Sequence, residues 1–356
     1  MATTWSFSLN SHDAWDAMYA DCRRAEQSID IEQFIINYEP ATRRFFELFV
    51  AKARSGVRVR ILCDMVGSYQ IYESPVVREL RDAGVVVQFV HPVSAWRVMN
   101  YTSWFFRDHR KLLLVDGKVG HTGGVGFNQK TEVWRDTNIR LEGPIVAQMQ
   151  EAYERMWKSV EEEKRRRIKQ RPDPVDGFMF LTDTPWFRDR FFYQNLLTTI
   201  KRAQSSIYLT TPYFVPPFRL FRRLRRAARQ GVDVRILLPL ASDIIIVDYA
   251  AHSFFTLALK AGIRIYRYQA GTLHAKTGVI DDRWATVGST NLDGLSFLLN
   301  NEANIVTTRR ECIAELKNHF LADIALAEEL QLGQWAKRSL LWKFIEILTW
   351  PIHGLL

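Results

Sequence analysis

Apolar positions along the chain fall into two alternating kinds of stretch. Longer, partly basic stretches have a helical pattern, and each is followed by a turn with glycine and a short run of β-branched residues, as at 56–62 and 231–237. Helices that alternate with buried strands are typical of sheets covered by helices. We therefore expect an α/β fold whose sheets are mostly parallel.

This order of elements occurs twice, which indicates two similar halves. Because each half repeats the same units, we expect two α/β/α halves that pack about an approximate two-fold axis. Three echoes carry the repeat: Ala25–Ile29 with Ala203–Ile207 and Ala83–Val85 with Ala261–Ile263 at a spacing of 178 residues, and Gly56–Leu62 with Gly231–Leu237 at a spacing of 175.

The repeat predicts four segments: a first half at 1–160, a charged linker at 161–176, a second half at 177–330 and an apolar or amphipathic tail at 331–356. Charges extend a solvated helix end in the linker, and prolines then stop it. Its basic residues either stay in solvent or contact anionic phosphates, and the sequence leaves both open. The arginines between 219 and 229 crowd one helix and are candidates for lipid headgroups.

Composition narrows the class of protein. The chain has 356 residues, 47% hydrophobic and 24% charged, which excludes a disordered or fibrous protein. Its net charge of +9 favours polyanionic partners, either nucleic acid or an anionic membrane. Three widely spaced cysteines without zinc-ligand spacing predict a reducing compartment and no structural metal. With neither a secretory signal nor about 20 consecutive apolar residues, we expect a cytoplasmic protein without a membrane span.

The candidate chemistry lies in a motif that each half carries once. Asp108–Asp116 and Leu273–Asp281 both contain H-x-K-x4-D, and a turn of small residues follows each one. Every landmark recurs at a spacing of 165 residues: His109 and His274, Lys111 and Lys276, Asp116 and Asp281, and the turns at 123–126 and 288–291.

The spacing within the motif has a chemical meaning. Residues i and i+2 of a strand face the same side, so each histidine points the same way as its lysine. Two imidazoles beside one phosphodiester suit a double displacement, in which one attacks phosphorus and the other protonates the leaving oxygen. Two lysines can neutralise the phosphate oxygens, so this chemistry needs no metal or other cofactor.

These residues resemble the phospholipase D superfamily over nearly the whole chain. Three flanking stretches, 134–144, 211–216 and 288–302, are similar to those of bacterial cardiolipin synthases, which are phosphatidyltransferases. The resemblance implies that His109 is the nucleophile and His274 the general acid/base, although the sequence itself is symmetric on this point. Both motif aspartates belong to the family's catalytic motif, but five residues beyond the lysine each lies too far along a strand to reach the same phosphate. We expect Asp116 and Asp281 to be structural.

The resemblance also assigns the residues that bind or orient the phosphate. It implies that Asn291 binds phosphate, that Ser289 and Gly124 in the turns line the site, that Glu302 orients His274 and that Asp136 orients His109. The chain departs from the family at Gly126, where asparagine is usual, and at Leu295, where arginine is common. Asn128 is a candidate to replace the first of these contacts.

Two apolar segments favour a lipid substrate. About thirteen extra residues in the first half precede His109, and they include Trp96, Tyr101, Trp104 and Phe105. Aromatic rings of this kind favour a membrane interface, so we expect either an acyl-chain contact or core packing. The tail contains Trp342 and Trp350, is too short and too charged to span a bilayer, and either lies in the interface or packs on the protein.

The leading hypothesis is phosphatidyl transfer from phosphatidylglycerol or a related phospholipid to a lipid hydroxyl, which yields cardiolipin. The expected partner is an anionic membrane, at whose cytoplasmic face the enzyme acts as a peripheral protein. One alternative is a phospholipase D or a nuclease of the same superfamily. Nucleic acid is the less favoured partner, because a nuclease should show a basic groove with stacking platforms. A second alternative is a catalytically silent membrane-binding module.

Overall fold

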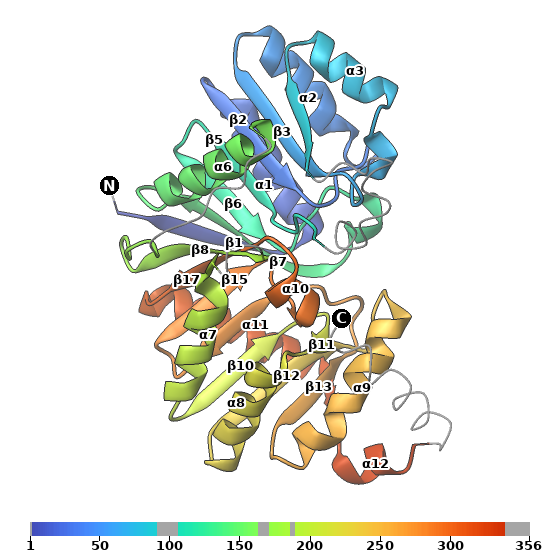
Figure 1. Ribbon diagram of the computed structural model, residues 1–356, viewed down its shortest axis with the longest axis vertical. Coiled ribbons are helices and arrows are strands. Elements are labelled where there is room, and N and C mark those ends of the chain that lie inside the picture. The colour runs from blue at the N-terminus through green and yellow to red at the C-terminus, as the bar shows by residue number, and fades with distance from the viewer. Residues whose placement is uncertain (1, 91–105, 163–170, 186–188, 339–356) are drawn as a thin grey trace.

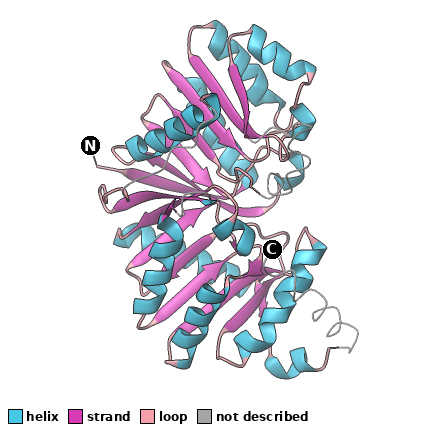
Figure 2. Cartoon of the chain, viewed as in Figure 1, coloured by secondary structure: helices cyan, strands magenta, loops and turns pink. Residues whose placement is uncertain are grey.

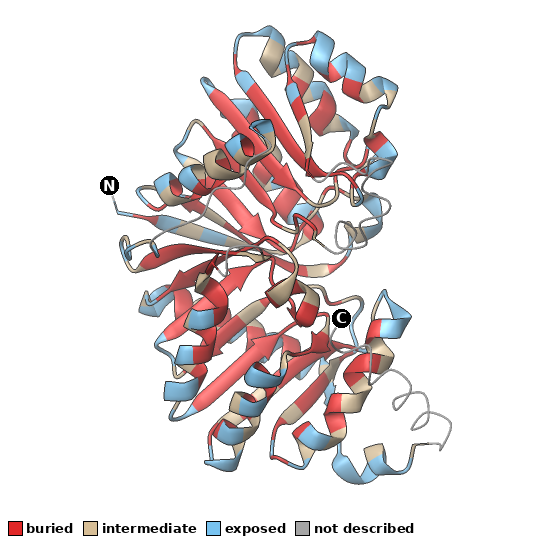
Figure 3. Ribbon diagram, in the orientation of Figure 1, coloured by how far each residue is buried: buried red, intermediate tan, exposed pale blue. Residues whose placement is uncertain are grey.

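Two β-sheets lie one above the other along the long axis of the molecule (Figure 1). The computed structural model describes residues 2–90, 106–162, 171–185 and 189–338. Helices lie on both faces of each sheet (Figure 2), and the strands form the buried layers between them (Figure 3). The prediction of two similar α/β halves is therefore confirmed.

The first sheet has seven strands in the order β1-β7-β6-β5-β2-β3-β4. Its α1, α2 and α3 side buries a core that includes Trp15, Phe45 and Phe49, while α6 covers the other side. The strands are β1 (Thr4–Asn10), β2 (Ser28–Gln33), β3 (Arg58–Asp64), β4 (Val86–Val90), β5 (Leu112–Val115), β6 (Val119–Gly123) and β7 (Arg135–Glu142). The helices are α1 (Ser11–Arg24), α2 (Arg43–Arg54), η1 (Tyr69–Ile71), α3 (Pro75–Asp82), η2 (Gln129–Thr131) and α6 (Val146–Glu161).

The second sheet has nine strands in the order β18-β13-β12-β10-β14-β15-β17-β8-β9, and a separate two-stranded sheet pairs β11 with β16. The strands are β8 (Phe178–Thr184), β9 (Asp189–Arg190), β10 (Ser206–Thr210), β11 (Phe214–Val215), β12 (Asp233–Pro239), β13 (Arg264–Tyr268), β14 (Thr277–Ile280), β15 (Trp284–Gly288), β16 (Leu292–Asp293), β17 (Glu302–Thr307) and β18 (Ala327–Glu329). The helices are α7 (Phe191–Arg202), α8 (Phe218–Arg229), α9 (Ile245–Leu259), α10 (Gly294–Leu298), α11 (Arg310–Ala325) and α12 (Leu332–Ala336).

The expectation of mostly parallel sheets was wrong. In the described part of each main sheet, only two neighbouring pairs are parallel: β2–β3 and β3–β4 in the first, β10–β12 and β12–β13 in the second. The echoed segments build these crossovers. The motif strands β5 and β14 instead turn back through tight turns at Asp116 and Asp281, both with a φ of 53°, and such short connections join antiparallel neighbours.

The echoed glycines end helices in both halves. Gly56 and Gly231 have φ values of 92° and 91°, and Gly84 and Gly262 have 94° and 89°. A left-handed residue just after a helix satisfies its last carbonyl groups and turns the chain, and glycine adopts that conformation without a steric cost. The repeat thus reflects a shared need to end a helix and start a strand within a few residues.

One apolar core belongs to both halves. Leu112 and Ile139 of the first sheet, Phe180 and Ile305 of the second, and Tyr153 of α6 lie in a single buried cluster. Burial of apolar surface stabilises the contact between the two sheets, so the halves form one body. Among the described residues, none of the helices has the length and apolar character needed to cross a bilayer.

Candidate active site

The two motif histidines lie where the halves meet. Each follows a backbone bridge to the opposite half, Asp108 with Asn301 and Leu273 with Arg135. The bridges continue through backbone hydrogen bonds, in which His109 N donates to Asn301 O over 3.0 Å and His274 N donates to Arg135 O over 2.8 Å. The same construction therefore serves both histidines, related by the approximate two-fold axis.

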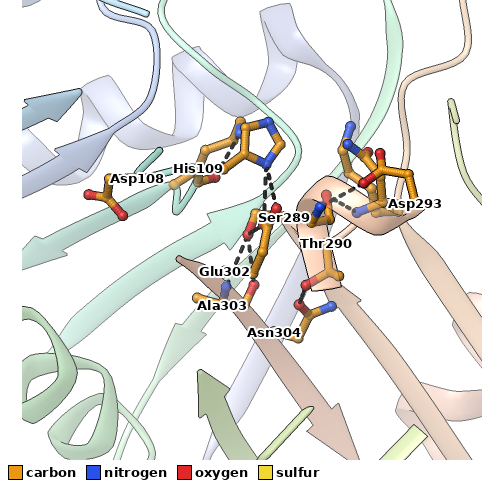
Figure 4. Close-up of polar contacts among 12 residues, drawn as sticks. Asp108, His109, Ser289, Thr290, Asp293, Glu302, Ala303 and Asn304 are labelled. Atoms are coloured by element: carbon orange, nitrogen blue, oxygen red, sulfur yellow. Dashed lines mark hydrogen bonds and ion pairs between the residues drawn. The ribbon is translucent and has the colours of Figure 1, made fainter. Parts of the chain in front are cut away.

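His109 contacts a carboxylate of the second half. Its Nδ1 lies 3.0 Å from Oε1 of Glu302, and Figure 4 shows the ring directed toward that side chain. The hydroxyl of Ser289 also donates to Glu302 (Figure 4). Glu302 and Ser289 are fully buried, so the contact lies out of solvent and fixes the ring.

His274 makes the matching contact with the first half. Its Nδ1 lies 2.7 Å from Oδ2 of Asp136. Gly124 stands beside that carboxylate, and a Cβ on Gly124 would lie 2.1 Å from Asp136 Oδ1. Glycine is required there because the carboxylate occupies the space. Ser289 and Gly124, predicted to line the phosphate site, thus contact the orienting acids.

The predicted pairing of acids with histidines was wrong. Glu302 contacts His109 and Asp136 contacts His274, so each acid orients the imidazole of the other half. The physical reason is the pair of bridges that follow the two-fold axis, since Asn301 immediately precedes Glu302 and Arg135 immediately precedes Asp136. Spacing along the chain carries no sign of this exchange.

The two lysines are buried beside the histidines. Lys111 Nζ donates to His109 O over 2.9 Å, and Lys276 Nζ donates to His274 O. Burial lowers the pKa of Lys276 to about 7 and that of Lys111 to about 8, against the attraction of Asp136 and Glu302. Burial of each ammonium group carries a desolvation cost, and a bound anion would offset that cost.

The charges of both lysines affect the pKa of both imidazoles. Burial lowers the pKa of His109 well below its usual range, and the charges of Lys111 and Lys276 lower it further. Burial likewise lowers the pKa of His274 to about 4, again with contributions from both lysines. The four side chains therefore share one electrostatic site. Neither histidine is sealed, because 13% and 15% of their side-chain surfaces are exposed.

Comparison with known proteins agrees with this geometry. A family model described as "Cardiolipin synthase, PLD-like domain" matches residues 19–157 and 196–324. Cardiolipin synthase A of Pseudomonas fluorescens is 35% identical over 332 residues, which covers 90% of this chain and 68% of the relative. The probable cardiolipin synthase YwiE of Bacillus subtilis is 32% identical and covers 93% and 68%. The chain belongs to the cardiolipin synthase family of phospholipase D-like enzymes.

Solved structures agree with the fold of a cardiolipin synthase family member. Phosphatidylserine synthase of Haemophilus influenzae superposes with a TM-score of 0.74 at 14% identity, covering 99% of this chain and 93% of its own. Polyphosphate kinase of Porphyromonas gingivalis has a TM-score of 0.63 at 11% identity, covering 93% and 49%. The resemblance seen in the motifs is thus confirmed at the level of family and fold.

The motif aspartates of this family member lie away from the histidines. Asp116 accepts hydrogen bonds from the backbone of Glu26, Gln27 and Ser28 at the start of β2. Asp281 accepts from the backbone of residues 204–206 at the start of β10. Their grouping with the catalytic residues is therefore corrected, and the structural role expected from their distance along the strand agrees with these contacts.

The two small-residue turns differ at the position where the cardiolipin synthase family usually has asparagine. Asn291 is buried, and its Oδ1 has no hydrogen-bond partner among the described residues. The corresponding residue of the first half is Gly126. Asn128 does not replace it, because its Oδ1 accepts from Lys130 N over 2.8 Å and caps η2.

Two aromatic residues at the site were missed in the sequence. Phe34 lies edge-on to His109 with ring centres 5.1 Å apart, and Trp134 lies 5.3 Å from His274. Trp134 stands two positions before Asp136, which was its only signal, and no predicted site residue lies near Phe34 in the sequence. The predicted lipid-contact residues lie outside the described residues: Trp96, Tyr101, Trp104, Phe105, Trp342 and Trp350. The part of the chain that the structure describes contains no cluster of three or more His, Cys, Asp or Glu side chains fit for a metal ion.

Proposed function

We propose that this protein is a phosphatidyltransferase that moves a phosphatidyl group from phosphatidylglycerol, or a related phospholipid, to a lipid hydroxyl to form cardiolipin. One observation carries the proposal: a His-Lys pair from each half enters a single site, and a carboxylate of the opposite half holds each imidazole at Nδ1. Membership of the cardiolipin synthase family supports the choice of a phospholipid substrate.

The first step is attack by His109 on phosphorus. An imidazole that donates from Nδ1 to Glu302 keeps the lone pair on Nε2, and its lowered pKa keeps the ring neutral. A bond forms between Nε2 and phosphorus while the bond from phosphorus to the headgroup oxygen breaks. His274 donates a proton to that oxygen, and glycerol leaves when the donor is phosphatidylglycerol.

The second step reverses these roles with a new alcohol. The hydroxyl of a second lipid gives its proton to His274 and attacks phosphorus, and the bond between phosphorus and His109 breaks. His274 must carry a proton in the first step, whereas burial and the lysines keep it neutral in the empty site. The negative charge of a bound phosphodiester raises the pKa of His274, so the substrate itself prepares the acid.

An exposed apolar tip beside the site supports membrane contact. Ile244, Ile245 and Ile246 lie at the start of α9 and Leu240 directly follows β12, with exposed surfaces of 44%, 71%, 44% and 52%. Asp243 joins this isoleucine tip to the site, since its Oδ1 accepts from Tyr213 Oη over 2.7 Å and its charge reaches Lys276. We place the tip in the interface of an anionic cytoplasmic leaflet, with the enzyme as a peripheral protein.

Product analysis tests the reaction. The protein is incubated with vesicles of labelled phosphatidylglycerol and, separately, with single-stranded DNA. We expect cardiolipin and glycerol in equal amounts from the vesicles. Phosphatidic acid without cardiolipin would identify a phospholipase D, cut DNA a nuclease, and vesicle binding without turnover a silent module. His109→Ala and His274→Ala serve as controls, each expected to lose at least about 10³-fold in rate.

A second experiment tests which histidine attacks. A phosphatidyl ester of p-nitrophenol has a leaving group that needs no proton, so His274→Asn should still release p-nitrophenol and retain a phosphatidyl group on His109. Alkaline quenching and peptide mass spectrometry locate the modification. His109→Asn should show none, and a phosphatidyl group on His274 would reverse the assignment.

A further inference from the structure

Gln33 is a buried amide with unused hydrogen-bonding capacity. It ends β2, its side chain is fully buried, and neither Nε2 nor Oε1 has a hydrogen-bond partner among the described residues. Leaving a buried amide unpaired costs free energy, and an apolar side chain of similar size would avoid that cost. The family motifs do not include this position, so the catalytic scheme above gives it no role.

Gln33 lies next to the lysine of the first motif. The antiparallel register of β2 and β5 ends at Glu32 opposite Leu112. Gln33 and Lys111 are therefore the next residues along the two strands, and their side chains share a face of the sheet. Phe34, the neighbour of Gln33, lies with its ring centre 5.7 Å from Lys111 Nζ. The unpaired amide of Gln33 thus lies beside the lysine that the proposed function assigns to the substrate phosphate.

The second half uses the same two positions differently. The bridge from Ile36 to Phe127 matches the pair Phe214–Leu292, which makes Thr211 the counterpart of Gln33 and Asn291 the counterpart of Gly126. Thr211 has its partners, because its hydroxyl donates to Tyr213 O and accepts from Leu292 N. In the second half the unpaired atom is Oδ1 of Asn291, whose side chain has a hydrogen bond with Asp293.

Gln33 also occupies the place of the missing asparagine. A Cβ on Gly126 would lie 4.0 Å from Gln33 Oε1, and no left-handed φ requires glycine at that position. The first half therefore has Gln33 with Gly126 where the second has Thr211 with Asn291. Each half therefore has one amide side chain at these two positions, at the end of β2 in the first half and in the turn after β15 in the second.

We propose that Gln33 is a substrate-binding residue, which donates from its amide to a non-bridging phosphate oxygen beside Lys111, the role that the family resemblance implies for Asn291 beside Lys276. This inference rests on the proposed function for the identity of the lipid, but only a phosphodiester is needed for the contact. Gln33 is 0% exposed, and Lys111 and Asn291 are each only 4% exposed, so the amide is buried to a degree similar to that of the two residues assigned to phosphate.

Binding of dimethyl phosphate tests the contact without a lipid. We expect Gln33→Leu to weaken its affinity in calorimetric titration by about 10-fold or more, because a hydrogen bond to a charged group is lost. The melting temperature should stay the same or rise, because a buried unpaired amide is removed. A purely structural glutamine would leave the affinity unchanged, and that result would overturn the proposal. Gln88→Leu is the matched control, since Gln88 Oε1 is also buried without a partner but lies on β4, two strands away from β2.

An exchange of the two arrangements provides a second test. Gln33→Thr should weaken dimethyl phosphate binding, and the double variant Gln33→Thr/Gly126→Asn, which copies the second half, should restore it to within about 3-fold of the native protein. Gly126→Asn alone should bind weakly, because two amides then compete for one place. A double variant as weak as Gln33→Thr would overturn the proposal. If the native protein formed no cardiolipin from phosphatidylglycerol, the proposed function would be refuted, but the binding results for dimethyl phosphate would still hold.

Discussion

Each motif histidine is held at Nδ1 by an acid that belongs to the opposite half. A carboxylate in this position selects the Nδ1–H tautomer and keeps Nε2 free for phosphorus. The two acids are not equivalent, because burial raises the pKa of Glu302 to about 7, whereas His274 and Lys276 lower that of Asp136 despite its burial. The two-fold axis thus relates the positions of the two acids, but their pKa values differ. This difference is compatible with one imidazole attacking phosphorus while the other transfers protons.

Double-mutant cycles test the exchanged pairing. Glu302→Gln should reduce kcat by about 10²-fold or more, and His109→Ala should add little to it because the two residues act as a unit. The effects of Glu302→Gln and His274→Ala on kcat should be more nearly additive. Asp136→Asn should instead couple strongly to His274→Ala and only weakly to His109→Ala. Rates of cardiolipin formation from phosphatidylglycerol, a reaction that requires both histidines, supply the data. Strong coupling of Glu302 to His274 instead would contradict the structure.

The lysines should make phosphate binding depend on pH. Lys276 and Lys111 have pKa values of about 7 and about 8, so their charge is nearly complete at about pH 6 and is lost as the pH rises through these values. Glu302 gains negative charge over the same range and acts in the same direction. Dimethyl phosphate keeps one negative charge throughout, so we expect its affinity to fall between pH 6 and pH 9, with proton uptake on binding at pH 8.

Calorimetry in buffers of different ionisation enthalpy measures that proton uptake. Lys276→Met serves as the control, because it should weaken binding at pH 6 and flatten the remaining pH dependence. An affinity that stays constant from pH 6 to pH 9 would show that the lysines keep their charge in the empty site.

The residues of the site were predictable from the repeated motif and from the resemblance to a family. His109, Lys111, His274 and Lys276 stand in two motifs with the same spacing, and chemistry then gives them a role. The partner of each histidine was not predictable, because a contact across the two-fold axis leaves no trace in spacing. A role for Gln33 was also not predictable, since a glutamine at the end of the alternating segment Ser28–Gln33 indicates only the end of a strand.

Turns and short helices decide how each motif strand meets its neighbours. Asp116 and Asp281 each accept three backbone hydrogen bonds or more from the start of the adjacent strand, and both adopt a φ of 53°, which aspartate and asparagine tolerate better than alanine. Through these hydrogen bonds the two aspartates connect the end of β5 to the start of β2 and the end of β14 to the start of β10. The sequence predicted the parallel crossovers because helices separate those strands, but it did not reveal the antiparallel strands that short turns join.

Substitution of these aspartates should reduce stability and spare the chemistry. Asp281→Ala removes the acceptor for the backbone of Gln204, Ser205 and Ser206, so we expect the free energy of unfolding to fall by about 2 kcal/mol. Asp281→Asn keeps one acceptor oxygen and the left-handed conformation, and it should cost less. Urea unfolding measures the stability, and the rate per folded molecule should stay within about 2-fold of native. A loss of rate comparable to that of His274→Ala would return Asp281 to the catalytic group.

At the scale of the whole molecule, the shared core makes the site a property of both halves together. Leu112 and Ile139 pack in one cluster with Phe180 and Ile305, and the backbone bridges beside the histidines run between the same two sheets. Neither half alone contains a motif histidine together with the acid that holds it. The duplicated pattern predicted two halves and a common site, whereas the depth of their contact depends on side chains far apart in the sequence.

The isoleucine tip allows membrane binding to be tested separately from chemistry. Ile244 and Ile245 make no part of the His-Lys site, yet Asp243 beside them is tied to Tyr213 near it, so a tip inserted in the interface would hold the site at the headgroups. Ile244→Ser/Ile245→Ser should weaken binding to anionic vesicles by about 10-fold or more, since each isoleucine loses its apolar contact. Leu257→Ser on the same helix, 36% exposed, is the control. Dimethyl phosphate binding should not change in either variant, and unchanged vesicle affinity in the double variant would show that another surface meets the membrane.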